Sequence, residues 1–384
     1  MDHSKMSYIT LSVYPILILI LFWKSKFIKK GEYNEEWNSV SETKAIQGLI
    51  ALCIVCHHTA QQTCASWLES RNIVHGLDPF LNIGFMLVAV FFFWSGYGLY
   101  KSVTGKSRYL SRFLKKRVFP VWVPYVIVCF LYTLVRLLFF KEKMPLWFII
   151  TNLTGITIGY EFGWYVQAII IFYILFYYSF KKTRFDSDAI MYIWIGVVIW
   201  NLMGIIIDHN DYFLRGEWWY NSTLLFPIGI TFAKHEEKIL SMIKKWYRVL
   251  APVSVVLLTA MIILSRYADT NMGYYGEYTG VTFETKIIWR VMTYLPQVFA
   301  AVMLVFVLIL ICMKIQFKNV VLDFLGSHTL EIYLTHGFFL QTMAVYYNYH
   351  KDSIFYGRPF LLLIITVILT IPASAGLKKI GRLL

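Results

Sequence analysis

Residues 290–313 read RVMTYLPQVFAAVMLVFVLILICM, and Arg290 is the only charged residue among these 24. A helix needs about 20 mostly apolar residues to cross the roughly 30 Å hydrocarbon core of a membrane. Segments of similar length and character recur along the whole chain, whereas a closed barrel would show short alternating strands. The sequence therefore predicts a membrane protein built from α-helices.

The composition agrees with a lipid environment. Of the 384 residues, 58% are hydrophobic and 15% are charged, which is too apolar for a water-soluble globule of this size. The net charge of +14 does not indicate nucleic acid, because the basic residues lie in short segments between apolar runs and not on one basic face. We therefore predict membrane lipid as a partner and no nucleic acid.

Eleven apolar segments are predicted to span the membrane, each with boundaries uncertain by roughly 2–4 residues. They are residues 8–23, 46–62, 83–100, 118–140, 163–180, 189–207, 221–234, 249–265, 290–313, 329–347 and 359–377. Residues 146–160 are also apolar, but they are short and interrupted by two glycines, so we expect a re-entrant or interfacial piece there. The predicted fold class is an all-α, polytopic integral membrane helical bundle of about 11 transmembrane helices.

The Lys and Arg residues lie mostly on one side of these spans. With the N-terminus outside, the inner segments hold 25 of them and the outer segments hold nine. Cytoplasmic loops are enriched in Lys and Arg, and one miscounted span would exchange the sides of all later loops. No small-residue cleavage site follows residues 8–23, so this segment is predicted to be a retained helix. We expect a multi-pass protein of the cell membrane with an outer N-terminus and a cytoplasmic C-terminus.

Two adjacent histidines, His57 and His58, lie within the second predicted span. Ionisable residues at membrane depth are costly to insert and are therefore candidates for function. A neutral imidazole can accept a proton from a hydroxyl group and return one to a leaving group, which suits acyl transfer. The alternative is a histidine that bonds to a neighbouring backbone carbonyl. Two in succession weaken this alternative, because they face different directions and both need partners.

Cys53, Cys56 and His57 match the Cys-x-x-Cys-His signature of c-type haem attachment. Haem attachment needs both thiols exposed on a loop-like segment, whereas these lie inside a continuous apolar run. A tetrahedral zinc site would need further ligands that no nearby spacing supplies. We predict neither haem nor a metal ion, and no permanently bound cofactor.

The densest group of basic residues lies between the third and fourth predicted spans. Residues 101–117 contain seven Lys and Arg, more than the orientation of the helices requires. Such clusters bind anionic head groups or the phosphates of a nucleotide. The more specific of these two hypotheses is a cytosolic ligand that carries phosphate.

Other polar residues are also predicted at membrane depth. Structural ion pairs, such as Arg290 with a carboxylate on another helix, are the default explanation for most of them. Glu331 and His336 are five residues apart and so do not share one helical face, which weakens a direct pairing between them. His336 nevertheless remains a candidate for function because it lies within the tenth span.

Four stretches, taken in order, resemble the acyltransferase family 3 membrane proteins, which are bacterial O-acyltransferases with a ten-helix core. Residues 45–58, AIQGLIALCIVCHH, resemble the first core helix, in which a basic residue followed by glycine precedes the catalytic histidine by eleven positions. His58 falls on that histidine, and Gln47 falls where the family usually carries arginine. The other similar stretches are residues 91–99 with the basic stretch 113–117, residues 163–165 with Tyr173, and residues 326–336.

The resemblance covers residues 41–379 and implies acyl-CoA, most often acetyl-CoA, as the donor. It implies a hydroxyl group of a cell-surface glycan or glycolipid as the acceptor. His58 is then the general base or a transient acyl carrier, and His57 and His336 are expected to assist catalysis. The residues expected to bind the donor are Arg112, Lys115, Lys116, Arg117, Lys44 and Gln47, and those expected to line the substrate cavity are Ser95, Trp164, Tyr165 and Glu331. Glutamine cannot supply the charge of arginine, so Lys44, one turn earlier, or the basic segment takes over that task.

The domain prediction follows from the same comparison. Residues 41–384 form an acyltransferase family 3-like membrane domain, and residues 1–40 add an N-terminal transmembrane helix and a basic cytoplasmic segment to the ten-helix core. One alternative is a transporter or flippase for a glycan precursor, whose path the same polar residues would line. Another is a scaffolding subunit that assembles with other cell-envelope glycan-assembly proteins. Acetyl transfer that depends on His58 would separate the enzyme from both alternatives.

Overall fold

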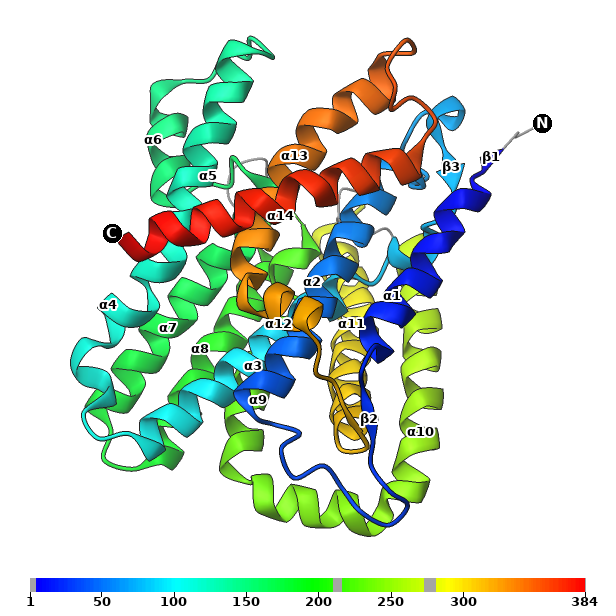
Figure 1. The fold of residues 1–384 in the computed structure, drawn as a ribbon. Helices are drawn as coiled ribbons and strands as arrows, with labels where there is room; N and C mark the ends of the chain where they lie inside the picture. Colours follow the sequence, from blue (N-terminus) through cyan, green and yellow to red (C-terminus); the bar gives the residue numbers. More distant parts are fainter. Residues whose placement is uncertain (1–4, 210–215, 273–280, 384) are drawn as a thin grey trace. The chain divides into compact units, whose positions relative to one another are not determined.

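The computed structural model describes residues 5–209, 216–272 and 281–383. This part of the chain is almost entirely helical, and its strands are four segments of two residues each. The chain divides into two compact units, one formed by residues 1–87 and 311–384 and the other by residues 88–310. Figure 1 shows the helices in chain order. The predicted all-α membrane fold is confirmed.

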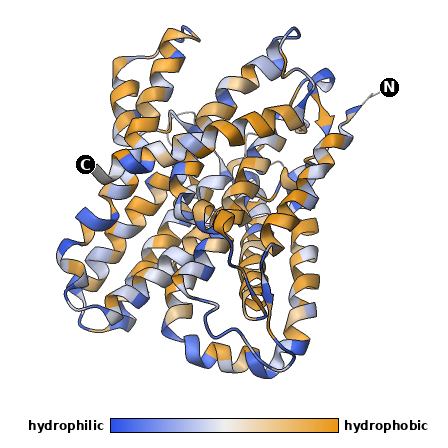
Figure 2. Ribbon diagram, in the orientation of Figure 1, coloured by the Kyte–Doolittle hydropathy of each residue, from blue (hydrophilic) through white to orange (hydrophobic). Residues whose placement is uncertain are grey.

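Eight helices in the described ranges are long and apolar enough to cross a membrane, and they coincide with eight of the eleven predicted spans. Figure 2 shows these long helices mainly in hydrophobic colours. Residues 8–23 and 221–234 instead give shorter apolar helices, Tyr8–Phe22 and Leu225–Lys234. Residues 329–347 form a helix of sufficient length, but its polar residues leave it less apolar than the eight. The total of eleven stays a prediction.

The first unit contains both ends of the chain. Its helices are α1 (Val13–Phe22), α2 (Val40–Thr63), α12 (Val320–Ser327), α13 (Thr329–Tyr349) and α14 (Pro359–Leu383), with 3-10 turns at Tyr8–Ser12, Ser70–Asn72 and Asp78–Phe80. Ser39 caps α2, because its side chain accepts a hydrogen bond from the backbone N–H of Glu42 at 3.3 Å. Helix α2 packs against α12, α13 and α14, so it is the central helix of this unit.

Helices α2 and α12 approach each other closely at two glycines. A Cβ atom added to Gly48 would lie 2.5 Å from the backbone nitrogen of Gly326. A Cβ atom added to Gly326 would lie 2.1 Å from the carbonyl oxygen of Lys44. A side chain at either position would force the two backbones apart. The two glycines therefore set the position of the segment that leads into α13.

Two short ribbons join segments that are predicted to lie on the same side of the membrane. Strand β1 (Lys5–Met6) pairs in parallel with β3 (Val74–His75), and both belong to predicted outer segments. Strand β2 (Lys26–Phe27) pairs antiparallel with β4 (Ile315–Gln316), and both belong to predicted inner segments. Within this unit, outer segments thus contact outer segments and inner segments contact inner ones.

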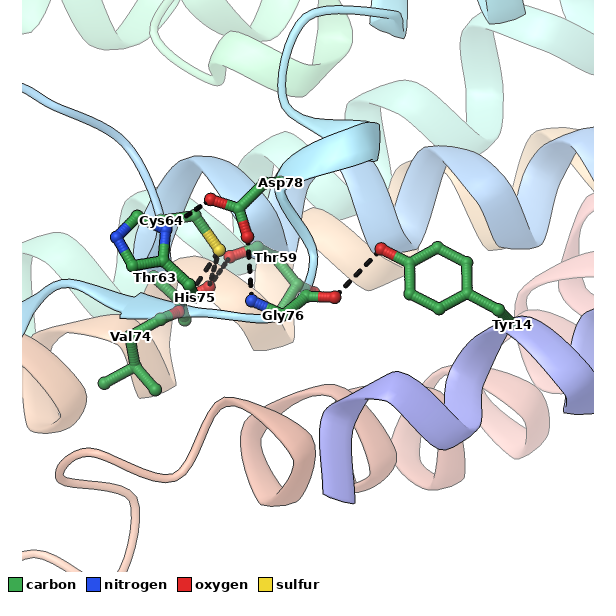
Figure 3. Close-up of polar contacts among 8 residues, drawn as sticks. All are labelled: Tyr14, Thr59, Thr63, Cys64, Val74, His75, Gly76 and Asp78. Carbon is green, nitrogen blue, oxygen red and sulfur yellow. Dashed lines mark hydrogen bonds and ion pairs between the residues drawn. The ribbon is translucent and has the colours of Figure 1, made fainter. Parts of the chain in front are cut away.

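Polar contacts hold the loop that follows α2 (Figure 3). The carboxylate of Asp78 is paired with Nδ1 of His75 and accepts the N–H of Gly76 at 2.8 Å. Burial acts to raise the pKa of the Asp78 carboxyl, but the hydrogen bonds from His75 and Gly76 outweigh it, so this pKa lies below its ordinary value. From α1, Tyr14 donates its hydroxyl to the carbonyl of Gly76 at 2.9 Å and stacks on Phe80 at 5.6 Å between centroids. The N-terminal helix therefore supports this loop.

The second unit contains the middle of the chain. Its helices are α3 (Gly84–Gly105), α4 (Phe113–Arg117), α5 (Phe119–Leu138), α6 (Leu146–Thr154), α7 (Trp164–Lys182), α8 (Asp186–Ile206), α9 (Leu225–Lys234), α10 (Glu236–Asn271) and α11 (Phe283–Cys312), with 3-10 turns at Tyr109–Arg112, Glu161–Gly163 and Glu217–Trp219. The boundaries between the units fall inside α3 and α11. Helix α7 packs against α4, α5 and α8, and α9 packs against α8 and α10.

Residues 234–248, the basic stretch between the seventh and eighth predicted spans, are almost entirely helical. Nearly all of them belong to α10, a helix of 36 residues that contains Pro252. Figure 1 shows this helix bending within its length. Proline has no N–H to donate and its ring displaces the preceding turn, so it bends a helix without ending it.

Helix α6 accounts for the short apolar piece at 146–160. It has nine residues, which is about 14 Å at 1.5 Å per residue and too short to cross the membrane. It ends at Gly155, whose φ of 81° lies in the left-handed region that glycine tolerates. A short helix followed by a turn fits the expected re-entrant or interfacial piece, whose position in the membrane stays a prediction.

Arg290 is the largest fully buried side chain of the second unit. Its guanidinium donates to the carbonyl oxygens of Ile205 and Ile207 at 2.8 and 3.0 Å, and to a carboxylate oxygen of Asp208 at 3.3 Å. The predicted ion pair of Arg290 is present, but its acid lies in the segment after α8 and not on another helix.

Candidate active site

His58 on α2 and His336 on α13 face each other within the first unit. Nδ1 of His58 lies 2.7 Å from Nε2 of His336. The ring centroids are 5.0 Å apart and the ring planes differ by 5°. This centroid distance is close to the N–N distance plus one ring radius at each end, so the two rings meet edge to edge in a common plane. That is the geometry of a hydrogen bond between ring nitrogens, and it brings together two of the three predicted catalytic histidines.

His58 lies near the C-terminal end of α2. The predicted span begins at residue 46, but α2 begins at Val40, 18 residues before His58. At 1.5 Å per residue this is about 27 Å from the start of the helix. Only five residues separate His58 from Thr63, the last residue of α2. The N-terminal part of α2 contacts α12 at Lys44 and Gly48, and the histidine pair lies beyond that contact.

His57 makes its hydrogen bond elsewhere, although its ring lies 4.9 Å from that of His58 between centroids. Its Nδ1 lies 2.7 Å from the carbonyl oxygen of Phe80, and because a carbonyl only accepts, this nitrogen carries the proton. The other edge of the ring packs on Gly84, where an added Cβ would lie 2.1 Å from Nε2. The structure thus places His57 at the loop after α2, and it does not bring His57 into the hydrogen bond between His58 and His336. These contacts fix the position of the His57 ring, and its predicted catalytic role stays a prediction.

Lys44 and Gln47 lie on the same face of α2 as His58. Eleven residues separate Gln47 from His58, which is close to three full turns. The Lys44 side chain is exposed and that of Gln47 is half-buried. Glu331 is half-buried in the first turn of α13. None of these three side chains forms a hydrogen bond or ion pair with another described residue.

The basic side chains of Arg112, Lys115 and Lys116 project from α4 and the turn before it, in the second unit. All three are exposed, and within the described ranges none of them pairs with a carboxylate. Helix α4 is anchored by Phe113, which is 1% exposed and packs on aromatic rings of α7 at 5.6 and 5.9 Å between centroids. One buried ring therefore holds a short helix whose cations point outward.

Arg117 differs from its basic neighbours. Its Nε donates to the hydroxyl of Tyr109 at 2.9 Å, and its guanidinium lies over the ring of Tyr109 at 5.8 Å. Close by, Ser95 of α3 shares a hydrogen bond of 3.0 Å with the hydroxyl of Tyr173. The ring of Tyr173 in turn contacts Phe113. The structure therefore links Ser95 to the basic helix, and gives Arg117 a partner inside the protein.

Trp164 and Tyr165 begin α7 and pack on α3. The ring of Phe92 lies 6.3 Å from Trp164 and 4.9 Å from Tyr165, between centroids. Trp164 is buried, whereas Tyr165 is half-buried. These contacts make both residues part of an aromatic cluster between two helices, and their predicted place in a substrate cavity stays a prediction.

Three groups that hold the histidines were not predicted. The carbonyl of Phe80 and the open space at Gly84 lie beyond a loop, and no pattern in the sequence indicates that this loop returns to α2. The third is the carbonyl of Ile332, which lies 2.9 Å from Nδ1 of His336. This contact could have been predicted, because a polar side chain in a helix often bonds to the carbonyl four residues earlier.

A family model described as an acyltransferase domain, Acyl_transf_3, matches residues 43–378. No curated protein and no solved structure matches the chain. The matched range agrees with the predicted one, includes both histidines of the pair and the basic helix, and begins after α1. The chain therefore belongs to acyltransferase family 3 and is a multi-pass membrane acyltransferase.

Proposed function

We propose that this acyltransferase moves an acyl group, most simply acetyl, from cytosolic acyl-CoA to a hydroxyl group of a cell-surface glycan or glycolipid. The observation that carries the proposal is the edge-to-edge pair of His58 and His336 within the membrane helices. A pair of neutral imidazoles can take up and return one proton without a permanent buried charge, which acyl transfer to a hydroxyl group requires.

In the proposed reaction, His58 removes the proton of the acceptor hydroxyl while the hydroxyl oxygen attacks the thioester carbonyl carbon. The new carbon–oxygen bond forms and the carbon–sulfur bond breaks. Coenzyme A leaves as a thiolate and takes up the proton that His58 holds. The products are the acylated acceptor and free coenzyme A, and His58 returns to its neutral form.

The exposed cations of α4 support acyl-CoA as the donor. Arg112, Lys115 and Lys116 present positive charges without an ion-pair partner in the described ranges, and phosphate groups are the anions that such charges bind. Lys44 is a further exposed cation, fourteen residues before His58 on α2, or about 21 Å along the helix. Coenzyme A carries its thioester at the end of a long flexible arm, so its phosphates and its reacting carbon can occupy distant places.

The excess of Lys and Arg in the predicted inner segments supports an outer N-terminus and a cytoplasmic C-terminus, and the contacts within the first unit agree with the predicted grouping of segments by side. The β1–β3 ribbon joins two predicted outer segments and the β2–β4 ribbon joins two predicted inner ones. Lys378, near the end of α14, donates to the carbonyl of Ser327 at the end of α12, and both lie in predicted inner segments. With this orientation, the basic segment at 101–117 faces the cytosol, where acyl-CoA is found.

The proposal is tested with the purified full chain in lipid nanodiscs and acetyl-CoA labelled in its acetyl group. We expect label to move to water or to an added carbohydrate acceptor, and His58→Ala to abolish this release. His350→Gln is the matched control, because His350 is an exposed histidine at the end of α13, and it should keep the parent rate. Transfer that persists in His58→Ala would exclude the proposed chemistry, and absence of any transfer would favour the transporter or the scaffold.

The donor site has its own test. Lys115→Gln combined with Lys116→Gln should raise the KM for acetyl-CoA by about tenfold while kcat changes little, because ground-state binding is lost. The control is Lys238→Gln combined with Lys245→Gln, which removes the same charge from two exposed positions of α10. Equal effects of the two double variants would show that only the net charge matters, and would reject α4 as the phosphate site.

A further inference from the structure

We propose that His336 is a positioning residue, which holds the proton of His58 on Nδ1 and so presents Nε2 of His58 as the reacting nitrogen. This inference rests on the proposed function of His58. The position of the proton can nevertheless be measured without turnover, so the two proposals fail separately.

The argument begins at a backbone carbonyl. Nδ1 of His336 lies 2.9 Å from the carbonyl oxygen of Ile332. A carbonyl oxygen can only accept a hydrogen bond, so Nδ1 of His336 must carry a proton. In a neutral imidazole the other nitrogen then has none. Nε2 of His336 is therefore an acceptor.

The next step fixes the proton of His58. Nδ1 of His58 and Nε2 of His336 are 2.7 Å apart, which is a hydrogen-bond distance and requires one proton between them. The proton of the neutral His336 ring is on Nδ1, so Nε2 of His336 has none to donate. The proton in the hydrogen bond between the two rings is therefore carried by Nδ1 of His58. His58 is thus protonated on Nδ1, and its Nε2 is the nitrogen that can take a proton from a hydroxyl group.

The edge-to-edge geometry lets this bond strengthen during the reaction. When Nε2 of His58 takes up a proton, the ring becomes positively charged, and its Nδ1–H points in the ring plane at the lone pair of His336. Hydrogen bonds with a charged donor are shorter and stronger than neutral ones. In soluble hydrolases a carboxylate holds the catalytic imidazole in the same way. A histidine does so without adding a buried negative charge, which is costly at membrane depth.

The same contacts exclude a direct role for His336. Its Nδ1 is bonded to Ile332 and its Nε2 to His58, so both nitrogens are engaged inside the protein. The side chain is fully buried. His336 therefore acts through His58, and the earlier expectation of a catalytic residue at this position becomes that of a positioning residue.

Two substitutions at this position separate positioning from packing. In His336→Gln, the amide oxygen can reach the place of Nε2 and accept from His58. In His336→Leu, a side chain of comparable bulk removes the acceptor. Purified chains labelled with 15N-histidine are placed in nanodiscs, and the His58 signal is identified among the nine histidines by its loss in His58→Gln. The nitrogen chemical shifts then report which ring nitrogen carries the proton.

We expect His58 to be protonated on Nδ1 in the parent and in His336→Gln, and to shift toward protonation on Nε2 in His336→Leu. With acetyl-CoA, His336→Leu should lower kcat by about 100-fold or more without a matching change in KM, and His336→Gln should recover most of the rate. A parent His58 that carries its proton on Nε2, or the same tautomer in the Leu variant, would overturn the inference. The expected tautomers in a chain that transfers no acyl group would instead reject only the proposed function.

Discussion

His57 and His58 are neighbours in one helix with ring centroids 4.9 Å apart, but a rotation of about 100° between them gives their ring nitrogens different partners. His58 meets α13 through His336, whereas His57 meets the loop after α2 through the carbonyl of Phe80. The sequence singled out His58 because it lies within a predicted span and falls on the family's histidine, and its catalytic role stays a prediction. The sequence does not show which partner each of the two histidines has, because these partners are distant in the chain and meet them only in the folded protein.

Substitution of His57 tests this division. Asparagine can place an amide N–H where Nδ1 was, so His57→Asn should keep the bond to Phe80 and most of the activity. His57→Leu leaves a buried carbonyl without its donor, which costs about 1–3 kcal/mol. We expect the Leu variant to melt at a lower temperature in nanodiscs while the remaining folded protein keeps a kcat close to that of the parent. A loss of kcat in the asparagine variant at unchanged stability would show that His57 takes part in the chemistry.

Glu217 gives a prediction about pH. Its side chain is 1% exposed, and burial, followed by repulsion from Asp269, raises its pKa well above the ordinary value of 4.5. The folded state then binds this proton more tightly than the unfolded state does. At acidic pH, ionisation of Glu217 has no effect on stability. The free energy of unfolding decreases as the pH rises from the pKa of Glu217 in the unfolded state toward its raised pKa in the folded state.

Glu217→Gln removes this ionisation and keeps an oxygen that can accept from Thr293, as Glu217 does at 3.2 Å. The variant should melt at the parent temperature near about pH 4, and a few degrees above it at neutral pH. The measurement is thermal unfolding in nanodiscs across this range. A melting difference that is the same at every pH would show that ionisation of Glu217 is not its cause.

At the scale of elements, hydropathy predicts helices that face lipid better than helices that the protein covers. Eight apolar spans were found in this way. Helix α13 is less apolar because it is packed between α2 and α14 and carries His336. Helix α10 extends through a charged stretch because only one of its faces meets other helices. The number of crossings therefore depends on burial within the protein, which a single sequence does not report.

The contact between α2 and α12 can be tested at its glycines. In Gly326→Ala the new Cβ would lie 2.1 Å from the Lys44 carbonyl oxygen, and a backbone atom cannot move aside as a flexible side chain can. We expect a loss of stability of about 1–3 kcal/mol and a lower kcat, because α12 leads directly into the helix that carries His336. Thermal unfolding and acetyl release measure the two effects.

Gly376→Ala is the matched control within the same unit. Gly376 lies in α14, and an added Cβ would meet no atom within 4 Å. Alanine favours a helix over glycine by about 1 kcal/mol, so this variant should be as stable as the parent or more so. If both alanine variants behave alike, the close approach of α2 and α12 is not what positions α13.

At the scale of the whole molecule, the predicted topology can be tested by labelling. Arg71 and Lys106 are exposed residues of loops on opposite sides in this prediction. In intact cells, a thiol reagent that cannot cross membranes should label Arg71→Cys, and should label Lys106→Cys only after the cells are opened. The parent, whose five cysteines are thiols mostly buried in the protein, gives the background. The reverse pattern would place the basic segment outside and remove the cytosolic donor from the proposal.

The hydrogen bond between His58 and His336 joins residues 278 positions apart in the chain. During synthesis, α2 enters the membrane early and α13 almost last. For most of translation, the growing chain therefore contains His58 without His336. Under the proposed function, a chain that stops before residue 336 would contain His58 without the residue that orients it. Acyl transfer would then begin only when translation is nearly finished.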